Sequence, residues 1–233
     1  MKSNLHYISQ KRRVKEDKRF VSGTGNYVQD VVLPNMKHAA VLQSPYPNAR
    51  ILSIDKVEAE ALPGVHIVLT GEELAEDINP IRLGLKLPEV KWYPLAVGTA
   101  RYVGEWVAIV VADNPYIAED ALELIDVDYE PLDPIMDPEE AFEEKTRLVH
   151  PGHGSNVLYH GHFTWGEVDD DFAAADDTLS FRARWGRSST VPIETFGALA
   201  QWDEGTEILD LWASIQMPNF VELLSSTLRY PLN

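Results

Sequence analysis

The chain has 233 residues and a mass of 26.2 kDa, enough for one large domain or two modest domains with cores of their own. Its 37 Asp and Glu residues outnumber its 20 Lys and Arg residues, and a surface with a net charge of −17 repels phosphate groups, so we expect neither nucleic acid nor a membrane as a partner. The absence of cysteine excludes disulfides, thiolate nucleophiles and cysteine-ligated zinc or iron–sulfur sites from this chain.

The first part of the chain alternates short strand patterns with helix patterns. Strands rich in Val, Ile or alternating residues are predicted at 38–43, 50–54, 65–69, 106–112 and 125–129. The clearest helix begins at Asn114 and Pro115, because Asn is a good N-cap and Pro is favoured at the first helical position. A second helix begins in the same way at Asp137 and Pro138.

Residues 150–156, rich in Gly, Pro and Asn, read as a linker between two folding units. Behind the linker the patterns predict a short helix and three strands, followed by a last amphipathic helix: 168–175, then 178–184, 194–202 and 207–214, then 218–228. The sequence therefore predicts an α+β fold, with one domain at 1–145 and a smaller, β-rich part at 146–233.

Composition and spacing alone identify no active site. His150, His153, His160 and His162 cluster, but no predicted helix fixes their spacing for a metal, so exposed loop histidines are the better interpretation. The twelve Asp and Glu residues between 119 and 144 do not follow the spacing of a calcium loop and are interpreted as a solvated face. No apolar run approaches the about 20 residues of a membrane span, and no secretory signal is predicted, so we expect a cytoplasmic protein.

Several motifs follow one another in an informative order. Residues 19–30 read RFVSGTGNYVQD, residues 33–40 read LPNMKHAA, and residues 44–51 read SPYPNARI. Shorter motifs come next: LPGV at 62–65, RYVGE at 101–105, AEDA at 118–121 and VDYEPL at 127–132. Together they closely resemble the α/β-hammerhead domain of the large subunit of molybdenum hydroxylases, the family of xanthine dehydrogenase, aldehyde oxidase and aerobic carbon monoxide dehydrogenase.

The part behind the linker resembles the beginning of the family's molybdopterin-binding domain. The motifs that carry this resemblance are GSNV at 154–157, Glu194 with GALA at 197–200, and WASIQMP at 212–218. The chain departs from frequent family residues at Gln43, where Arg is common, at Trp106, where Pro is common, and at IETF (193–196), where MEPR is frequent. These departures do not change the fold prediction, but with them the motifs no longer indicate one subfamily.

The resemblance implies a molybdenum-dependent hydroxylase or dehydrogenase that oxidises an aldehyde, a purine or carbon monoxide with water-derived oxygen. In the family, the glutamine that corresponds to Gln216 hydrogen-bonds an oxygen ligand of molybdenum, so Gln216 is the candidate cofactor-binding residue. No catalytic residue and no metal ligand is assigned within the chain. The glycine-rich loop, the other pterin contacts and the general-base glutamate are expected beyond Asn233.

The resemblance also implies partners. They are the remainder of the molybdopterin-binding large subunit, an FAD subunit and an iron–sulfur subunit that carries the [2Fe-2S] clusters. We expect the chain to be an N-terminal fragment or a split subunit that is inactive alone and binds molybdopterin only with the C-terminal part. The alternative is a non-catalytic interaction or assembly module with a hammerhead fold.

Overall fold

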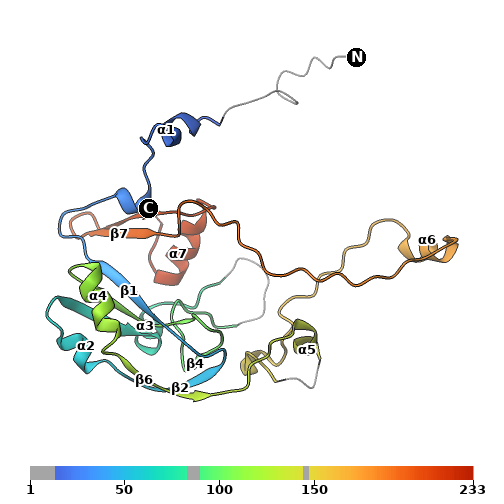
Figure 1. The fold of residues 1–233 in the computed structure, drawn as a ribbon, viewed down its shortest axis with the longest axis horizontal. Coiled ribbons are helices and arrows are strands. Elements are labelled where there is room, and N and C mark those ends of the chain that lie inside the picture. Colours follow the sequence, from blue (N-terminus) through green and yellow to red (C-terminus); the bar gives the residue numbers. More distant parts are fainter. Residues whose placement is uncertain (1–13, 83–89, 144–146, 233) are drawn as a thin grey trace. The chain divides into compact units, whose positions relative to one another are not determined.

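The computed structural model describes residues 14–82, 90–143 and 147–232 (Figure 1). The chain divides into two compact units, each built from two segments. The smaller unit combines residues 1–34 with 186–216, and the larger unit combines residues 35–185 with 217–233. None of the helices in the described part of the chain is long and apolar enough to cross a membrane.

The larger unit contains two antiparallel sheets of three strands each. In the first, β5 (Trp106–Ala112) lies between β1 (His38–Gln43) and β3 (Val65–Thr70). In the second, β2 (Ala49–Asp55) lies between β4 (Thr99–Ala100) and β6 (Asp126–Pro131). All five strands predicted for this part are confirmed; the two-residue strand β4 was not predicted.

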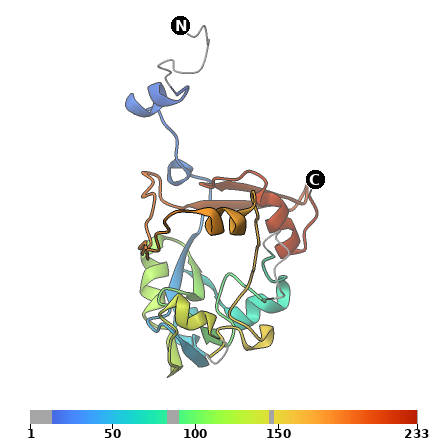
Figure 2. The ribbon, with the colours of Figure 1, turned by 90° about the vertical axis from the view of Figure 1, so that its right-hand side faces the viewer.

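Helix α4 (Pro115–Leu122) packs against the first sheet (Figures 1 and 2). It begins where the sequence predicts, because the Asn114 side chain accepts a hydrogen bond from the Ile117 N–H at 3.0 Å. Its inner face consists of Ala118 and Ala121, both fully buried. The helix can therefore lie close to the sheet, since these two helix side chains are no larger than a methyl group.

Two further helices of this unit were not predicted. Helix α2 (Val57–Ala61) packs against β3, and α3 (Gly71–Asp77) follows β3 directly. Thr70 and Glu73 form a capping box at the start of α3, in which each side chain accepts from the backbone N–H of the other residue.

The core of the larger unit consists of small side chains. The largest fully buried residues are Val68, Val107, Val110 and Ser44. Seven alanines are fully buried as well: Ala49, Ala59, Ala100, Ala108, Ala112, Ala118 and Ala121. All six tryptophans lie outside this core. Close backbone packing, more than large side chains, therefore fills the interior.

The rest of the larger unit is mostly irregular. It contains α5 (Pro138–Phe142), the 3-10 helix η2 (Pro151–His153), α6 (Val168–Ala174) and α7 (Phe220–Leu228). The helices predicted near 138, 168 and 218 are thus confirmed, within a few residues at their ends. The strand predicted at 178–184 is wrong, because those residues pair with no strand in the described structure.

The smaller unit is built on one hairpin. Strand β7 (Ala198–Asp203) pairs with β8 (Ile208–Ala213), with Ala198 opposite Ala213 and Asp203 opposite Ile208. Helix α1 (Asp17–Val21) and the 3-10 helix η1 (Val28–Asp30) belong to the same unit. Both hairpin strands were predicted, although β7 begins four residues later than the pattern suggested. Together the two units confirm the α+β fold class.

Candidate functional site

Gln216 lies just beyond β8, in the turn before α7. Ser214, two residues before it, links the two strands at the open end of the hairpin. The Ser214 hydroxyl accepts a hydrogen bond from the Gly197 N–H at 2.9 Å and donates one to the Thr195 carbonyl at 3.0 Å. The Ser214 N–H donates to the Gly197 carbonyl at 3.0 Å. The Gln216 side chain is exposed and makes no hydrogen bond within the described residues. Its amide is therefore available to a group outside the chain, as donor or as acceptor.

Glu194, the other motif residue of this unit, has a partner within the chain. Its Oε1 accepts a hydrogen bond from the Val28 N–H at 3.0 Å. Gly197 also lies close to Val28, since a Cβ placed on Gly197 would be 3.5 Å from Val28 Cγ1. Glu194 thus fastens η1 to the segment before β7, and its role in the structure is to hold the unit together.

Helix α7, which follows Gln216, is fastened to the end of α3. The Asn79 N–H donates to the Thr227 carbonyl at 2.8 Å, and the Asn79 amide donates to the Ser226 carbonyl at 2.8 Å. Arg229 donates from Nε to Asn79 Oδ1 at 3.1 Å and from Nη2 to the Ile78 carbonyl at 3.1 Å. Figures 1 and 2 both show α7 beside α3. We call these contacts of Asn79 and Arg229 the α7 latch.

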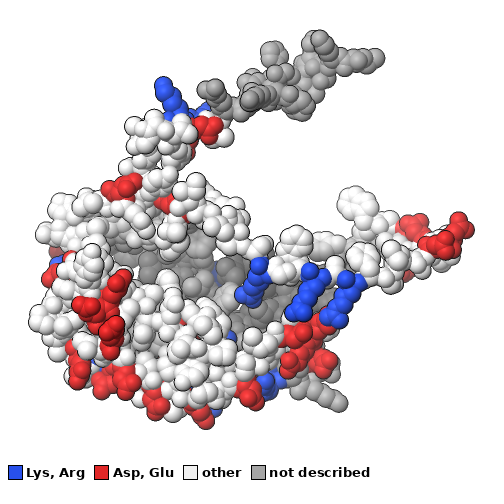
Figure 3. All heavy atoms as spheres, viewed as in Figure 1, with Lys and Arg blue, Asp and Glu red and all other residues white. Residues whose placement is uncertain are grey.

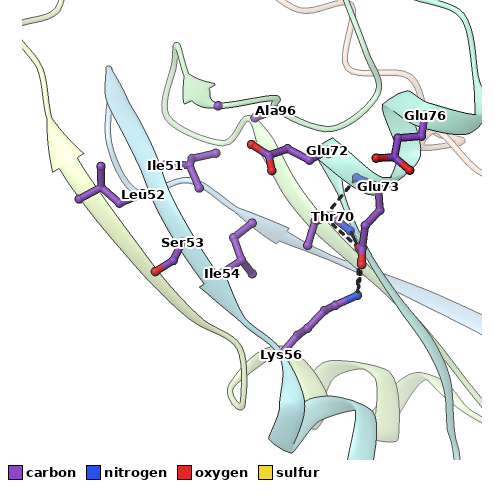
Figure 4. Close-up of a pocket in the computed structure, with 12 residues that line it drawn as sticks. Ile51, Leu52, Ser53, Ile54, Lys56, Thr70, Glu72, Glu73, Glu76 and Ala96 are labelled. Carbon is purple, nitrogen blue, oxygen red and sulfur yellow. Dashed lines mark hydrogen bonds and ion pairs between the residues drawn. The ribbon is translucent and has the colours of Figure 1, made fainter.

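A pocket of about 320 Å³ opens beside β2 and α3 in the larger unit (Figure 4). Lys56 reaches into it and donates to both oxygens of Glu73, at 2.6 and 2.9 Å, and to the Val68 carbonyl at 2.7 Å. Lys56 also lies 3.1 Å from Glu60. Glu72, another residue that lines the pocket, adds a further carboxylate.

The electrostatics of this pocket are those of a structural ion pair. Burial acts to lower the pKa of Lys56, but the hydrogen bonds and charges of Glu73 and Glu60 outweigh it and leave that pKa raised. The Lys56 hydrogen bond, and then the Thr70 N–H, hold the pKa of Glu73 below its ordinary value. Lys56 therefore stays charged and paired with Glu73 and Glu60, so it is not a candidate base or nucleophile.

The motif residues Arg101 and Glu105 lie in one loop. The Arg101 N–H donates to Glu105 Oε2, and the Arg101 guanidinium donates to the Thr99 carbonyl at 3.0 Å. Burial raises the pKa of Glu105, against the opposing effect of Arg101. The Ser44 N–H donates to the Glu105 carbonyl and the Gly104 N–H donates to the Ser44 carbonyl, both at 2.8 Å. Two motifs of the sequence thus hold one another in place.

The histidines and the acidic stretch form no metal centre in the described part of the chain, where no group of three or more His, Asp or Glu residues could hold an ion. His160 and His162 are exposed, as expected, whereas His150 and His153 are half-buried, and His153 Nε2 lies 3.2 Å from the Val157 carbonyl. Figure 3 shows carboxylates scattered over the surface in view. This distribution agrees with a solvated acidic surface.

Two family models cover most of the chain. The model of the aldehyde oxidase and xanthine dehydrogenase a/b hammerhead domain matches residues 22–133, and the model of the molybdopterin cofactor-binding domain matches residues 149–233. The chain belongs to the molybdenum hydroxylase family. The resemblance read from the motifs is thereby confirmed, and so is the hammerhead domain followed by the beginning of a molybdopterin-binding domain.

Individual curated proteins and solved structures are similar to this chain over most of its length. The gamma subunit of the 6-hydroxypseudooxynicotine dehydrogenase complex of Paenarthrobacter nicotinovorans is 33% identical over 97% of this chain and 29% of its own length. The carbon monoxide dehydrogenase large chain of Hydrogenophaga pseudoflava is 34% identical over 92% of this chain and 28% of its own. The crystal structure of quinoline 2-oxidoreductase from Pseudomonas putida 86 superposes with a TM-score of 0.84 at 38% identity, over 93% of this chain and 28% of that one.

The chain thus spans somewhat less than a third of the length of these relatives. It corresponds to the N-terminal portion of their large subunits. The complete relatives are more than three times as long as this chain.

The Gln216 side chain has the donor and acceptor groups that a contact with a molybdopterin group requires. The exposed amide of Gln216, free of hydrogen bonds within the described residues, can meet an oxygen of a bound group. Glu194, Lys56 and Glu105, in contrast, each have a hydrogen-bond partner within the chain.

Proposed function

We propose that this chain is the N-terminal part of the large subunit of a molybdenum-dependent hydroxylase or dehydrogenase. The observation that carries the proposal is the pair of family matches: a hammerhead domain at residues 22–133 and a molybdopterin cofactor-binding domain at residues 149–233. In this proposal residues 1–145 are the hammerhead domain and residues 146–233 are the N-terminal portion of the molybdopterin-binding domain. Its partners are the rest of the large subunit, an FAD subunit and an iron–sulfur subunit, all cytoplasmic.

Within such an enzyme Gln216 orients the cofactor. When bound, the molybdenum–molybdopterin group supplies the oxidation of an aldehyde, a purine or carbon monoxide with oxygen derived from water. The neutral Gln216 amide donates a hydrogen bond to an oxygen of that group and fixes its orientation without adding charge. Ser214 supports this role, because its hydrogen bonds to Gly197 and Thr195 fix the chain two residues before Gln216. In the absence of the complementary polypeptide, the chain is inactive.

The proposal is tested by reconstitution. The 233-residue chain is produced alone and together with the polypeptide from its source organism that corresponds to the rest of the large subunit. Bound molybdenum and pterin are then measured, and oxidation of aldehydes, purines and carbon monoxide is assayed with the FAD and iron–sulfur subunits present. We expect molybdenum only in the reconstituted sample. Stoichiometric molybdenum in the isolated chain would show that the chain binds the cofactor without its complement.

A matched pair of variants isolates the amide. Gln216→Ala in the reconstituted enzyme should lower activity or molybdenum retention about 10- to 100-fold, as removal of a group that supports a metal ligand does. Gln201→Ala, an exposed glutamine on β7, should leave both unchanged. Equal effects of the two variants would contradict the role of Gln216. A stable complex that never carries molybdenum would instead favour the non-catalytic assembly module.

A further inference from the structure

Residues 178–185 have the pattern of a β-strand although they form none. Leu179, Phe181 and Trp185 alternate with polar residues, and Ala183 fills the remaining odd position. A period of two is the signature of an extended strand with one apolar face, and it does not fit an amphipathic helix. The three large side chains are nevertheless 86%, 82% and 90% exposed. The apolar face of this segment therefore has no cover in the described structure.

The backbone of the same segment is equally unpaired. Figure 1 draws the chain between α6 and β7 as a plain coil. Within the described residues, no N–H or carbonyl group of residues 178–185 takes part in a backbone hydrogen bond. An extended segment with free N–H and C=O groups and an apolar face is a template for strand addition, in which main-chain bonds give affinity and alternate side chains give specificity.

Only one face of the segment is left for a partner. Arg182, on the polar face, donates to Glu139 of the same chain at 2.7 Å. The odd-numbered face, with Leu179, Phe181 and Trp185, makes no hydrogen bond or ion pair with any other described residue. A partner that suits it is an extended strand whose own apolar side chains meet these three, since charged side chains would be desolvated there without compensation.

We propose that residues 178–185 form a β-strand by pairing with a strand of the polypeptide that corresponds to the rest of the large subunit. The length outside this structure supports that occupant: in the 6-hydroxypseudooxynicotine dehydrogenase gamma subunit, about 70% of the sequence lies outside the 29% that this chain matches. The inference rests on the proposed function, because it takes its partner from it. The inference goes beyond the proposed function by naming residues 178–185 as the segment that binds the rest of the large subunit and strand pairing as the way in which it binds.

The experiment measures amide hydrogen exchange in the full chain, with and without the complementary polypeptide described above. Pairing should slow exchange of alternate amides of residues 178–185 by at least about tenfold, since ladder hydrogen bonds protect them. The affinity of the complex is measured in parallel for two double variants. Leu179→Asp with Phe181→Asp should weaken binding by at least about tenfold, whereas Thr178→Asp with Ser180→Asp, on the opposite face, should change it by less than about threefold.

The outcomes separate this inference from the proposed function. A tight complex in which residues 178–185 exchange as in the free chain, or in which both double variants behave alike, overturns the strand and leaves the proposed function standing. Failure of any complex to form overturns both. Protection that appears in the chain alone and grows with its concentration assigns the pairing to a second copy, and also overturns the inference.

Discussion

The backbone N–H of Val28 donates to the carboxylate of Glu194, 166 positions further along the chain, at 3.0 Å. Glu194 also stands in one of the motifs typical of molybdenum hydroxylases. The contact means that the N-terminal motif and the segment before β7 belong to one folded unit, although the whole hammerhead region lies between them in the sequence. The smaller unit can therefore form only after about the first 200 residues have been synthesised.

Removal of this carboxylate should loosen the smaller unit. Glu194→Ala leaves the partly buried Val28 N–H without its acceptor, which we expect to cost about 1–3 kcal/mol of local stability. Glu194→Gln retains an acceptor oxygen and should cost less. The measurement is amide exchange at Val28, which should accelerate in the order wild type, Gln, Ala. Glu204→Ala, at an exposed position of the same unit, serves as the control, and an equal effect there would contradict the assignment.

Arg229 should be needed for the attachment of α7, through both its side chain and its backbone. It occupies the left-handed region with φ of 57° while donating to Asn79 and Ile78. Arg229→Ala loses the hydrogen bonds but keeps the backbone cost, whereas Arg229→Gly loses the bonds and relieves about 1 kcal/mol of that cost. Amides of α7 should therefore exchange fastest in Arg229→Ala, with Arg229→Gly between it and the wild type. If the amides of α7 exchange faster in Arg229→Gly than in Arg229→Ala, the left-handed backbone of Arg229 does not affect the attachment of α7.

Gly71 should tolerate no side chain. A Cβ at this position would lie 1.9 Å from the Ala96 carbonyl oxygen, and that oxygen belongs to the backbone and cannot rotate away. Gly71→Ala should lower the free energy of unfolding by about 1–3 kcal/mol, the usual cost of overpacking, or by more. Gly152→Ala is the matched control, because among the described residues other than its chain neighbours no heavy atom lies within 4 Å of its Cβ position. Urea denaturation of the two variants measures the difference, and equal midpoints would contradict the packing.

Asp113 should make the larger unit sensitive to acid. Hydrogen bonds from Lys37 and then His66 hold the pKa of Asp113 at about 2, below its ordinary value of 3.8. The folded state therefore binds this proton less readily than the unfolded state, so the stabilisation is present above about pH 4 and is lost as the pH falls toward 2. Asp113→Asn should flatten the dependence of unfolding free energy on pH between 5 and 2. Asp120→Asn, an exposed carboxylate on α4, should keep the wild-type dependence.

The local signals in the sequence predicted most of the larger unit. Alternating Val and Ile residues and the Asn114–Pro115 cap act over a few neighbours, and the structure confirms the strands and the helix that they indicate. Helix α3 was missed although Thr70 and Glu73 have the spacing of a capping box, because the preceding strand pattern runs directly into it. A reading of that spacing at the end of a strand would have found the helix.

The remaining differences come from interactions that are not local. The strand pattern at 178–184 describes a segment with an apolar face, but a strand exists only when another strand pairs with it, and none does in the described residues. The contacts of Glu194 with Val28 and of Arg229 with Asn79 join positions about 150 or more residues apart, so no window of sequence contains them. Gln216 is a candidate through family resemblance alone, since an exposed glutamine after a strand carries no chemical signal of its own.

The alanine-rich core has a practical consequence for spectroscopy. Because small side chains fill the interior, every tryptophan remains at least partly open to solvent. Trp212 is half-buried, and the other five range from 39% exposure at Trp106 to 95% at Trp165. Indole emission moves to shorter wavelength when water is removed from around the ring. The intrinsic fluorescence of this chain is therefore a poor monitor of how its own core folds and a sensitive, label-free monitor of any surface that comes to cover it, with Trp165 and Trp185 having the most to gain.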